Sequence, residues 1–569
     1  MTEIGTAADA PGYPGEFAQR YRAAGLWSDR TIAQQFRATA DSRPEQPAVV
    51  GPSGRLSYAE LDEQTDRIAV GLRALGLRPG DRVLLQVNND LPAVLAWYGM
   101  LKAGLVPVAT LVQHRAHELT AVARACAPAA HLIDTGYPAY DLAALAGEIA
   151  AGQPSLRVLL ATGPGRGHAT LDDLARTPGE PAALRAQVEQ WQREISPDAV
   201  VALQLSGGTT STPKLIPRRH AEYWYNSQAY AAAIELGPGS CVAHILPIVH
   251  NAGIVCALHA AHSAGAALAL VPHDPDQLAA VARQIPVTHM LMSPPMAADV
   301  LRRPGLAAAL SSMFALTWVL GTMPPALLDL FEAGTCRVTQ MFGMAEGLCM
   351  YTARSAPREL RLRSVGTPVS RLDEIRVYTP GTEDPVAPGQ PGELCCRGPY
   401  TIRGYYRAPE RNAEVFTADG FYRTGDIVVE LGDGYYALAD RIKDLINRGG
   451  EKVNAAEVEE LLMRHPAIER VAVVAMPDAM LGERCCAFIV LADGASPDSA
   501  SPDSASPDSA SPIDVAALRT HLAALGVAKF KYPERVEIRP ELPMTSVTKL
   551  NKTALRTEIA TLLAAEGRP

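Results

Sequence analysis

The chain has 569 residues, too many for a single hydrophobic core, so we expect two or more domains. Its 52 Lys and Arg against 61 Asp and Glu give a net charge of -9, with no basic stripe that would follow a nucleic-acid backbone. The opening MTEIGTAADA lacks the basic start and apolar run of a secretory signal, and no apolar run is long enough to span a bilayer. Composition thus argues against nucleic acid and membrane as partners, and the cytoplasm is the expected location.

The first 341 residues alternate predicted helices and strands. The aromatic-rich segment 13–27 predicts an arm that docks on the body of the protein. A helix over 56–77, a strand over 82–87 and a helix over 91–102 follow. The alternation continues with a strand, a helix and a strand: 316–320, 324–334 and 337–341. This order predicts an α/β fold in which helices cover the faces of large parallel sheets.

The sequence pattern changes after Pro368. Short runs punctuated by Gly and Pro predict a small antiparallel barrel or sheet up to Val429. Another α/β region follows Asp440, with a helix, a strand and a helix: 457–465, 471–475 and 513–525. We place a boundary near 441–443. Residues 1–440 then form the N-terminal domain, with a β-rich subdomain over 368–440, and residues 441–569 form a small α+β domain.

Residues 496–512 read SPDSASPDSASPDSASP, a five-residue repeat too polar and proline-rich to pack. We expect a disordered loop over 495–512. A tolerated insertion between a strand and a helix explains it better than a binding role, because long surface loops cost little to close.

The nine cysteines are dispersed and show no C-x-x-C spacing. An odd, scattered count is typical of reduced thiols rather than of disulfides. The neighbouring pairs Cys395, Cys396 and Cys485, Cys486 lie in apolar runs that read as strands. We therefore expect small buried side chains there and not metal ligands.

The stretch Leu205–Lys214, LSGGTTSTPK, is the strongest candidate for an anion site. Its glycines, Gly207 and Gly208, leave room for backbone N–H groups to surround a phosphate. Five hydroxyl side chains can donate further hydrogen bonds: Ser206, Thr209, Thr210, Ser211 and Thr212. The run Val200–Leu205 reads as a buried strand, and open α/β sheets bind ligands at strand ends. An ordinary surface turn has the same composition, so the loop alone leaves both interpretations open.

Four later motifs decide between them: FGMAEG (342–347), YRTGDI (422–427), DRIKDLINRGGEKV (440–453) and PMTSVTK (543–549). With the loop, in this order and spacing, they resemble the adenylate-forming superfamily of acyl-CoA synthetases and nonribosomal peptide adenylation domains. The resemblance covers nearly the whole chain. KLIPRRH after the loop, the HN pair at 250–251, GPYTIRGYY and INRGGEKV are more narrowly similar to the stand-alone aryl acid AMP ligases that begin siderophore and aryl-capped peptide assembly.

The resemblance implies an acid-activating reaction. A carboxylate attacks the α-phosphate of ATP and expels pyrophosphate, so the site must hold a polyanion and stabilise a charged in-line transition state. ATP and Mg²⁺ are the implied cofactors, and Glu346 would bind Mg²⁺, which prefers oxygen ligands. Lys549 would reach the reacting carboxylate from the small domain, although its position also fits a surface lysine on a terminal loop. Lys549, Glu346 and Thr210 form the implied catalytic set.

The resemblance also assigns the nucleotide. The loop would hold the β- and γ-phosphates, and Asp426 would accept both ribose hydroxyls with Arg441 nearby. The implied ATP-binding residues are Ser206, Gly207, Gly208, Thr209, Thr210, Lys214, Gly343, Met344, Ala345, Asp426, Arg441 and Lys549. Some positions depart from the family pattern, because Ser211, Ser546, Thr548 and Asp440 stand where glycines are common. The charged residues of the set are all present, so activity is expected.

In this superfamily the small domain rotates between adenylation and thiol transfer. Lys443 matches the hinge position, and Gly449, Gly450 and Lys452 would approach the incoming pantetheine, where small residues let a backbone come close. We find no appended carrier domain with a modifiable serine motif. The expected acceptor is the phosphopantetheine thiol of a separate aryl carrier protein, and an aryl-CoA ligase that uses free coenzyme A is the alternative.

The acid pocket is assigned by the same resemblance. Asn251 matches an amide that contacts the ortho hydroxyl or a ring heteroatom of the acid, and an amide can serve either by donating or by accepting. Cys256 falls where salicylate enzymes carry cysteine, which argues against a second ring hydroxyl. Ala252 replaces a usual aromatic residue and so favours a larger acid. Against this, Thr322 replaces a usual glycine on another wall of the site, and Cys349 replaces a usual aliphatic residue.

The implied acid-binding residues are His250, Asn251, Ala252, Cys256, Gly321, Thr322, Ala345 and Cys349. We expect a monocyclic or bicyclic ortho-hydroxy or N-heteroaromatic acid, such as salicylate, 3-hydroxypicolinate or a hydroxyquinaldate. A P-loop phosphotransferase is excluded because Leu215 follows Lys214 and the GxxxxGK[ST] spacing is absent. A non-catalytic scaffold would be expected to have lost the lysine or the acids.

Overall fold

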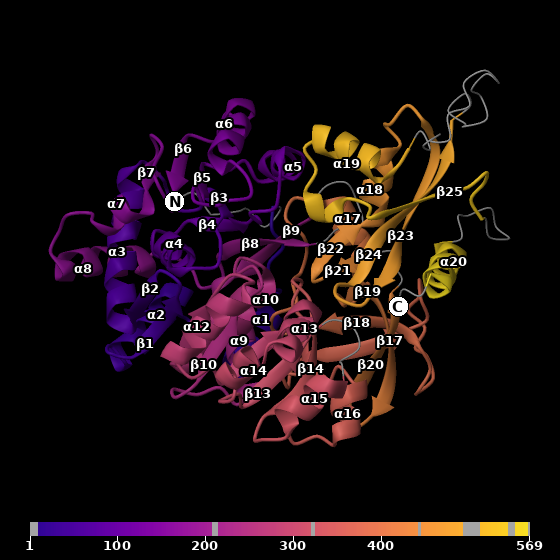
Figure 1. The fold of residues 1–569 in the computed structure, drawn as a ribbon. Coiled ribbons are helices and arrows are strands. Elements are labelled where there is room, and N and C mark those ends of the chain that lie inside the picture. The colour runs from indigo at the N-terminus through magenta and orange to yellow at the C-terminus, as the bar shows by residue number, and fades with distance from the viewer. Residues whose placement is uncertain are drawn as a thin grey trace.

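The computed structural model describes residues 9–206, 214–319, 325–441, 445–492, 513–543 and 552–566. These residues form two large, mainly parallel sheets, a four-stranded antiparallel sheet and a five-stranded C-terminal sheet (Figure 1). The predicted α/β class with a β-rich subdomain and an α+β C-terminal part is confirmed. The hinge segment 442–444 and the SPDSA repeat lie outside the described residues, so the predicted boundary at 441–443 stays a prediction.

The seven-stranded sheet has the order β7-β6-β5-β3-β4-β8-β9. Its strands are β3 Arg82–Gln86, β4 Val106–Ala109, β5 Ala130–Ile133, β6 Val158–Ala161, β7 Ala169–Thr170, β8 Val200–Ser206 and β9 Lys214–Arg219. All neighbours pair in parallel except β8 and β9, which are antiparallel. Helices on this part of the chain are α3 Tyr58–Ala74, α4 Leu91–Lys102, α5 Ala116–Cys126, α6 Leu142–Gly152, α7 Leu171–Ala175 and α8 Pro181–Arg193.

The nine-stranded sheet has the order β16-β15-β14-β13-β12-β10-β11-β1-β2. Its strands are β1 Pro47–Gly51, β2 Gly54–Ser57, β10 Cys241–His244, β11 Ala267–Leu270, β12 His289–Met292, β13 Ala315–Trp318, β14 Arg337–Gly343, β15 Cys349–Tyr351 and β16 Thr367–Pro368. Its helices are α2 Ile32–Ser42, α9 His220–Ala233, α10 Asn251–Gly253, α11 His259–Ala264, α12 Pro275–Gln284, α13 Pro294–Arg302, α14 Pro304–Ala309, α15 Pro325–Glu332 and α16 Arg358–Arg363. The largest apolar core contacts both large sheets and contains Trp97, Leu132 and Leu268.

Local sequence explains where these helices begin. Ser57 caps α3 and Glu60 completes a capping box, which satisfies backbone N–H groups that the first helical turn leaves unpaired. The Asp90 side chain caps α4 by accepting the Leu91 N–H, without a capping box, and proline occupies the first turn of α4. Nearly all of α4 is buried, because its sequence is apolar on every face.

The β-rich subdomain is an antiparallel sheet and not a closed barrel. Its strands are β17 Glu374–Tyr378, β18 Gly392–Arg397, β19 Tyr422–Gly432 and β20 Tyr435–Arg441, and α17 Pro409–Val415 lies between β18 and β19 in the chain. The predicted aromatic arm docks here. It contains α1 Gly15–Ala23, and the Trp27 indole donates a hydrogen bond of 2.9 Å to the Pro399 carbonyl. The Arg403 guanidinium lies 4.6 Å from the centre of the Phe17 ring.

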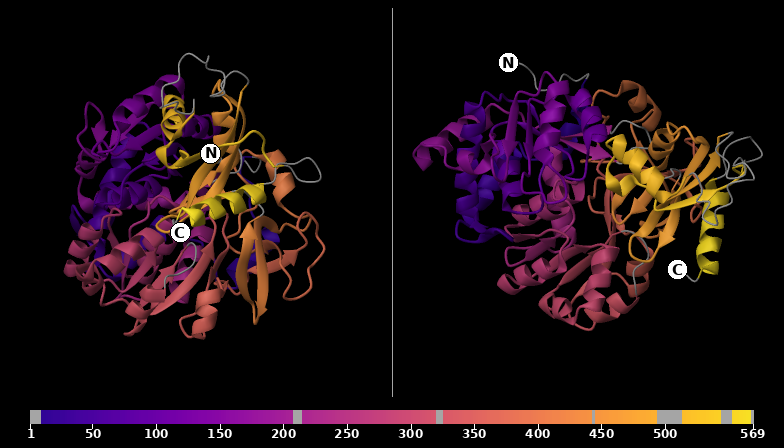
Figure 2. Two further views of the ribbon diagram at one scale, coloured as in Figure 1. Left: turned by 45° about the vertical axis from the view of Figure 1, so that its right-hand side comes forward. Right: turned by 45° about the horizontal axis from the view of Figure 1, so that its top comes forward.

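The C-terminal elements, orange to yellow in Figure 2, pack beside the N-terminal part in both views. They are β21 Leu445–Arg448, β22 Glu451–Asn454, α18 Ala455–Leu462, β23 Ile468–Asp478, β24 Gly482–Leu491, α19 Val515–Ala524, a 3₁₀ turn Lys529–Lys531, β25 Arg535–Ile538 and α20 Lys552–Ala565. Among the described helices, none combines the length and the apolar character that crossing a bilayer requires. All nine cysteines are free, as predicted, and all are buried, including the two neighbouring pairs for which burial was expected.

A buried charge cluster joins α5 to the C-terminal part. The Lys531 ammonium lies 3.1 Å from the Glu118 carboxylate of α5 and 2.9 Å from the Glu457 carboxylate of α18. The Ala528 N–H also donates to Glu118 at 3.1 Å. Burial by itself would raise the pKa of Glu118, but Lys531, together with His114 and the backbone N–H groups of Arg115 and Ala528, more than offsets it, and the net result is a pKa below the usual value. One lysine therefore compensates two buried carboxylates across the contact.

We predict that Lys531→Met weakens this contact by about 3 kcal/mol or more, because two buried carboxylates lose their cation. Urea unfolding measures the loss. Lys529→Met, an exposed lysine in the same 3₁₀ turn, is the control and should leave the unfolding free energy unchanged. Because the folded-state pKa of Glu118 is depressed, its contribution is complete above the ordinary glutamate pKa of about 4.3 and is lost as the pH falls through the folded value. Equal stability of both variants at neutral pH would contradict the prediction.

Candidate active site

The predicted phosphate loop connects two strands of the seven-stranded sheet. β8 ends at Ser206, β9 begins at Lys214, and these two residues face each other in the antiparallel ladder. The loop therefore leaves and rejoins the sheet at one point. Lys214 is half-buried, and its ammonium lies 5.2 Å from the centre of the Tyr405 ring. The loop interior, including Gly207, Gly208, Thr209 and Thr210, lies outside the described residues.

The FGMAEG motif forms a tight turn between β14 and β15. The Gly347 N–H donates to the Met344 carbonyl at 3.1 Å, and the backbone at Gly347 has φ +136°. A side chain at Gly347 is excluded, because its Cβ would lie 2.0 Å from the Tyr400 carbonyl oxygen. The Ile402 N–H also donates to the Glu346 carbonyl at 2.8 Å. The GPYTIRGYY segment thus fixes the position of this turn.

Glu346 is held by two tyrosines that the motif assignments had passed over. The residue is 8 % exposed, and its Oε1 accepts hydrogen bonds from Tyr405 at 2.7 Å and Tyr422 at 3.3 Å. The two hydroxyls lie 2.9 Å apart. Burial raises the pKa of both tyrosines, so they stay protonated and able to donate. Tyr405 lies in GPYTIRGYY and Tyr422 opens YRTGDI, so the motifs contained the signal.

One carboxylate in this setting suits Mg²⁺ that arrives with phosphate. Mg²⁺ is commonly bound by one or two carboxylates together with substrate phosphate oxygens. Within the described ranges, no group of three or more His, Cys, Asp and Glu side chains could hold a metal by itself. Both tyrosine contacts go to Oε1 of Glu346. The Glu346 carboxylate is therefore a candidate ligand for a cation that arrives with the nucleotide.

The predicted ribose residues are neighbours in the β-rich sheet. Asp426 on β19 pairs with Arg441 on β20. The Asp426 N–H donates to the Thr424 hydroxyl at 3.0 Å, which fixes the backbone at this point. β19 also carries Tyr422, so one strand connects the candidate ribose site with the candidate Mg²⁺ site.

The predicted acid-binding residues gather around the start of α10. His250 is the N-cap, and its Nδ1 accepts the Ala252 N–H at 3.3 Å. The Asn251 side chain is 9 % exposed, and its Nδ2 lies 3.5 Å from the Met344 carbonyl. The FGMAEG turn, which contains Ala345, therefore lies directly against Asn251.

Two buried thiols belong to the same region. Cys256 lies in a π-helical turn, Ile254–Leu258, and Cys349 begins β15. π-Helical turns are frequent at functional sites. Burial raises the pKa of Cys256 to about 12 and that of Cys349 well above its usual value, and Cys256 adds to the shift at Cys349. Both side chains are therefore neutral and weakly polar. Gly321 and Thr322 lie outside the described residues.

Arg218 is the main residue that the motif assignments missed. It lies on β9 with no exposed surface, and its guanidinium binds both carboxylate oxygens of Glu222, at 3.0 and 2.6 Å. It also donates to the Ala345 carbonyl at 2.8 Å and the Asn251 Oδ1 at 3.5 Å. KLIPRRH contains this arginine, but a sequence does not distinguish a buried arginine from an exposed one.

The residues predicted to approach the thiol form the β21–β22 hairpin. Gly449 and Gly450 make its turn, with φ of +58° and +104°, values that favour glycine. Lys452 lies on β22 opposite Asn447. The predicted hinge Lys443 and the predicted catalytic Lys549 lie outside the described residues.

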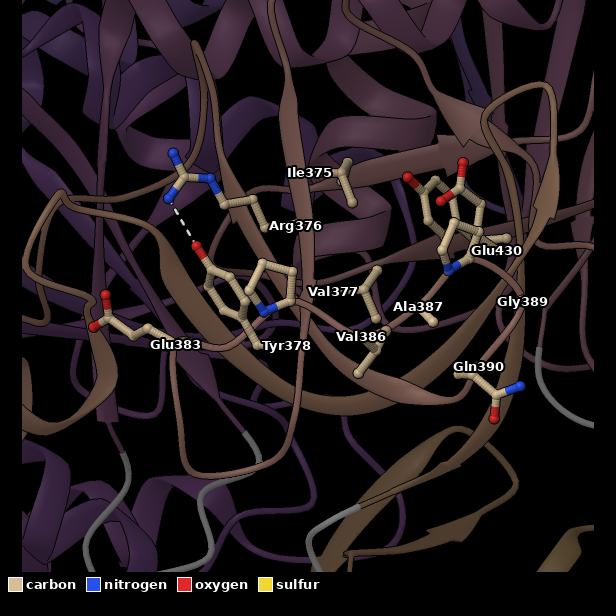
Figure 3. A pocket seen from close by; sticks show the side chains of 13 residues that line it. Ile375, Arg376, Val377, Tyr378, Glu383, Val386, Ala387, Gly389, Gln390 and Glu430 are labelled. Atoms are coloured by element: carbon tan, nitrogen blue, oxygen red, sulfur yellow. Dashed lines mark hydrogen bonds between the residues drawn. The ribbon is translucent and has the colours of Figure 1, made fainter.

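A separate hollow of about 410 Å³ opens on the β-rich sheet. The side chains that line it come from β17, the segment 383–390, Glu430 and Tyr436 (Figure 3). Arg376 donates to the Tyr378 hydroxyl at its edge, at 2.7 Å. None of these residues belongs to the predicted ATP or acid sites. This hollow is therefore distinct from the site described above.

Comparisons with known proteins agree with the family resemblance. Residues 36–406 match the AMP-binding enzyme family, and residues 457–549 match the AMP-binding enzyme C-terminal domain. Pyochelin synthase PchD of Pseudomonas aeruginosa is 37% identical, with 98% of each chain covered. The 2,3-dihydroxybenzoate-AMP ligase of Bacillus subtilis is 36% identical, over 97% of this chain and 98% of its own.

Two further matches extend this picture. The 2-hydroxy-7-methoxy-5-methyl-1-naphthoate--CoA ligase of Streptomyces carzinostaticus is 35% identical, over 99% of this chain and 98% of its own. The apo structure of MbtA from Mycobacterium smegmatis matches with a TM-score of 0.69 and 35% identity, over 97% of this chain and 100% of that chain. The predicted likeness to stand-alone aryl acid adenylating enzymes is confirmed, and the chain belongs to the AMP-binding enzyme family.

Proposed function

We propose that the protein activates an aromatic carboxylic acid with ATP, releases pyrophosphate and passes the acyl group from its adenylate to a phosphopantetheine thiol. One observation carries this proposal. The FGMAEG turn contacts the candidate acid residue Asn251 on one side and carries the candidate Mg²⁺ ligand Glu346 on the other. Lys214, at the end of the phosphate loop, lies against the Tyr405 ring that also faces Glu346. An acid and a triphosphate bound there would be adjacent.

The chain's own groups are suited to holding charge rather than to forming a covalent bond. The loop and Lys214 would hold the β- and γ-phosphates, and Asp426 would hold the ribose with Arg441 beside it. Mg²⁺ bound with ATP would neutralise phosphate charge. Tyr405 and Tyr422 would keep the Glu346 carboxylate in place for that cation. Such positioning and charge stabilisation account for most of the catalysis in phosphoryl-type displacements.

The acid we propose is aromatic, with an ortho hydroxyl or a ring nitrogen. Asn251 supplies the polar contact, and the neutral thiols of Cys256 and Cys349 would face the ring. Ala252, half-buried, leaves room beside the ring where a larger side chain would fill it. The 2,3-dihydroxybenzoate and hydroxynaphthoate named in two relatives support an ortho-hydroxy aromatic acid of one or two rings.

A catalytic Lys549 gives the first test. Lys549→Ala should lower acid-dependent pyrophosphate exchange at least about 10²-fold, because the cation that stabilises the transition state is removed. ATP binding, measured by calorimetry, should be largely retained. Lys529→Ala is the control for loss of one lysine from the same domain, and its exchange rate should equal that of the wild type.

The assay uses salicylate, 3-hydroxypicolinate and 3-hydroxyquinaldate. Exchange with aliphatic or amino acids alone would overturn the aryl acid proposal. An unchanged rate in Lys549→Ala would show that another residue supplies the charge.

The acceptor has two candidates, and each has support. The expected acceptor is a separate phosphopantetheinylated carrier protein. The naphthoate-CoA ligase relative favours free coenzyme A as the second candidate. Transfer from the enzyme-bound adenylate to each thiol, followed by mass spectrometry, distinguishes them. We expect the carrier protein to be acylated faster, and faster coenzyme A turnover would establish the alternative.

A variant of the β21–β22 turn tests the thiol route itself. Gly450→Ala should slow acyl transfer to either thiol several-fold while pyrophosphate exchange continues, because a side chain at that turn would obstruct the approaching pantetheine. Gly432→Ala is the matched control, since Gly432 also has a positive φ, +98°, and nothing lies within 4 Å of the added Cβ. If both variants lose the same fraction of the acyl-transfer rate, backbone strain explains the effect, and Gly450 does not lie on the path of the thiol.

A further inference from the structure

The Asn251 carboxamide has a fixed orientation. Sequence leaves open whether this amide donates to the acid or accepts from it. Its Oδ1 accepts a hydrogen bond of 3.0 Å from the Tyr223 hydroxyl and lies 3.5 Å from Nη1 of Arg218. Its Nδ2 has one contact in the described part of the chain, the 3.5 Å approach to the Met344 carbonyl. The oxygen therefore accepts from two donors of the protein, whereas only one of the two N–H groups has a protein acceptor in the described part of the chain, the Met344 carbonyl.

The reverse orientation is excluded by the chemistry of the neighbours. A guanidinium only donates hydrogen bonds, so the amide atom that faces Arg218 has to be the oxygen. The Tyr223 hydroxyl accepts from Gln204 Nε2 at 3.0 Å, which directs its own proton toward Asn251. Burial raises the pKa of Tyr223, so this hydroxyl keeps its proton. Both neighbours are donors, and both need an acceptor.

The two donors are themselves immobile. Arg218 is fully buried and forms a two-pronged ion pair with Glu222, four residues further on. Its guanidinium lies 4.3 Å from the centre of the Tyr223 ring, so the arginine and the tyrosine restrain each other. The hydrogen bond from Arg218 to the Ala345 carbonyl, at 2.8 Å, ties this cluster to the FGMAEG turn. Turning the Asn251 amide around would leave buried donors facing its NH₂ group.

We propose that Arg218 and Tyr223 act as positioning residues that reserve the N–H of Asn251 for the substrate, so that the site selects aromatic acids with a hydrogen-bond acceptor ortho to the carboxyl group. This inference rests on the proposed acid activation. A ring nitrogen is such an acceptor. An ortho hydroxyl also qualifies, because its proton bonds to the adjacent carboxylate and leaves an oxygen lone pair for Asn251. An ortho amine does not qualify, since it presents N–H groups to an N–H group.

Acids matched in size test this selection in pyrophosphate exchange. The monocyclic set is picolinate, benzoate and 2-aminobenzoate, and the bicyclic set is quinaldate, 2-naphthoate and 3-amino-2-naphthoate. Whether the pocket admits one set or both, the expectation is the same within each. The value of kcat/KM for the ring-nitrogen acid (picolinate or quinaldate) should exceed that for the ortho-amino acid (2-aminobenzoate or 3-amino-2-naphthoate) about tenfold or more. The value for the unsubstituted acid (benzoate or 2-naphthoate) should lie between them. A buried donor left without an acceptor produces discrimination of that size.

A pair of variants isolates the orientation from the rest of the pocket. Tyr223→Phe removes one of the two donors that fix Oδ1. The ratio of kcat/KM for the ring-nitrogen acid to kcat/KM for the ortho-amino acid should therefore fall several-fold, while the KM for ATP is unchanged. Tyr225→Phe is the control. Tyr225 lies on the same helix, α9, and its hydroxyl contacts Ser370 at 2.8 Å instead of Asn251. Its ratio should equal that of the wild type.

The outcomes separate the two proposals. No exchange with any acid of either set, nor with salicylate, 3-hydroxypicolinate or 3-hydroxyquinaldate, would overturn the proposed function and this inference with it. Exchange in which the ortho-amino acid equals or exceeds the ring-nitrogen acid would overturn the inference alone. If the Tyr223→Phe variant keeps the wild-type ratio of kcat/KM between these two acids, Tyr223 does not contribute to substrate selection.

Discussion

The buried ion pair between Arg218 and Glu222 is the interaction on which the site depends. Burial by itself would lower the pKa of Arg218, but the charge and hydrogen bonds of Glu222, with smaller contributions from Tyr223 and Tyr13, more than offset it, so the pKa is raised and the guanidinium is charged. A buried charge without its partner costs several kcal/mol, so the pair fixes where β9 meets α9. The remaining donors of Arg218 reach Ala345 and Asn251. One side chain thus connects the strand after the phosphate loop, the FGMAEG turn and the acid pocket.

The N-terminal arm closes this cluster from outside. The Arg219 guanidinium donates to the Ala10 carbonyl at 2.6 Å, next to the buried Arg218. Tyr13 packs edge-on against Trp27 with 4.8 Å between ring centres, and Glu222 and Arg218 both affect the pKa of its buried hydroxyl. The arm therefore keeps water away from the ion pair, and low polarity strengthens the hydrogen bonds within it. This gives the aromatic segment 13–27 a structural role in the site.

The fold could be predicted from the sequence, because the patterns that mark each helix, strand and turn lie within short stretches of the chain. The helix expected over 91–102 is α4, and the antiparallel texture after Pro368 is the β17–β20 sheet. Motifs also predicted that the FGMAEG turn and Asn251 belong to one site. They did not predict Arg218, Tyr405 or Tyr422, because the roles of these side chains arise from burial and from contacts across elements distant in the chain. The orientation of the Asn251 amide could not be predicted either, because the residues that set it lie on other elements, β8, β9 and α9.

We propose that the acid binds beside Asn251 with the nucleotide at Asp426. A crystal structure with a non-hydrolysable analogue of an ortho-hydroxyaryl or picolinyl adenylate tests it most directly. We expect the ortho acceptor to lie within about 3.2 Å of Asn251 Nδ2, Oδ1 still to face Tyr223 and Arg218, and the ribose to contact Asp426. An acyl group that does not reach Asn251, or an amide turned so that Oδ1 faces the ligand, would contradict it.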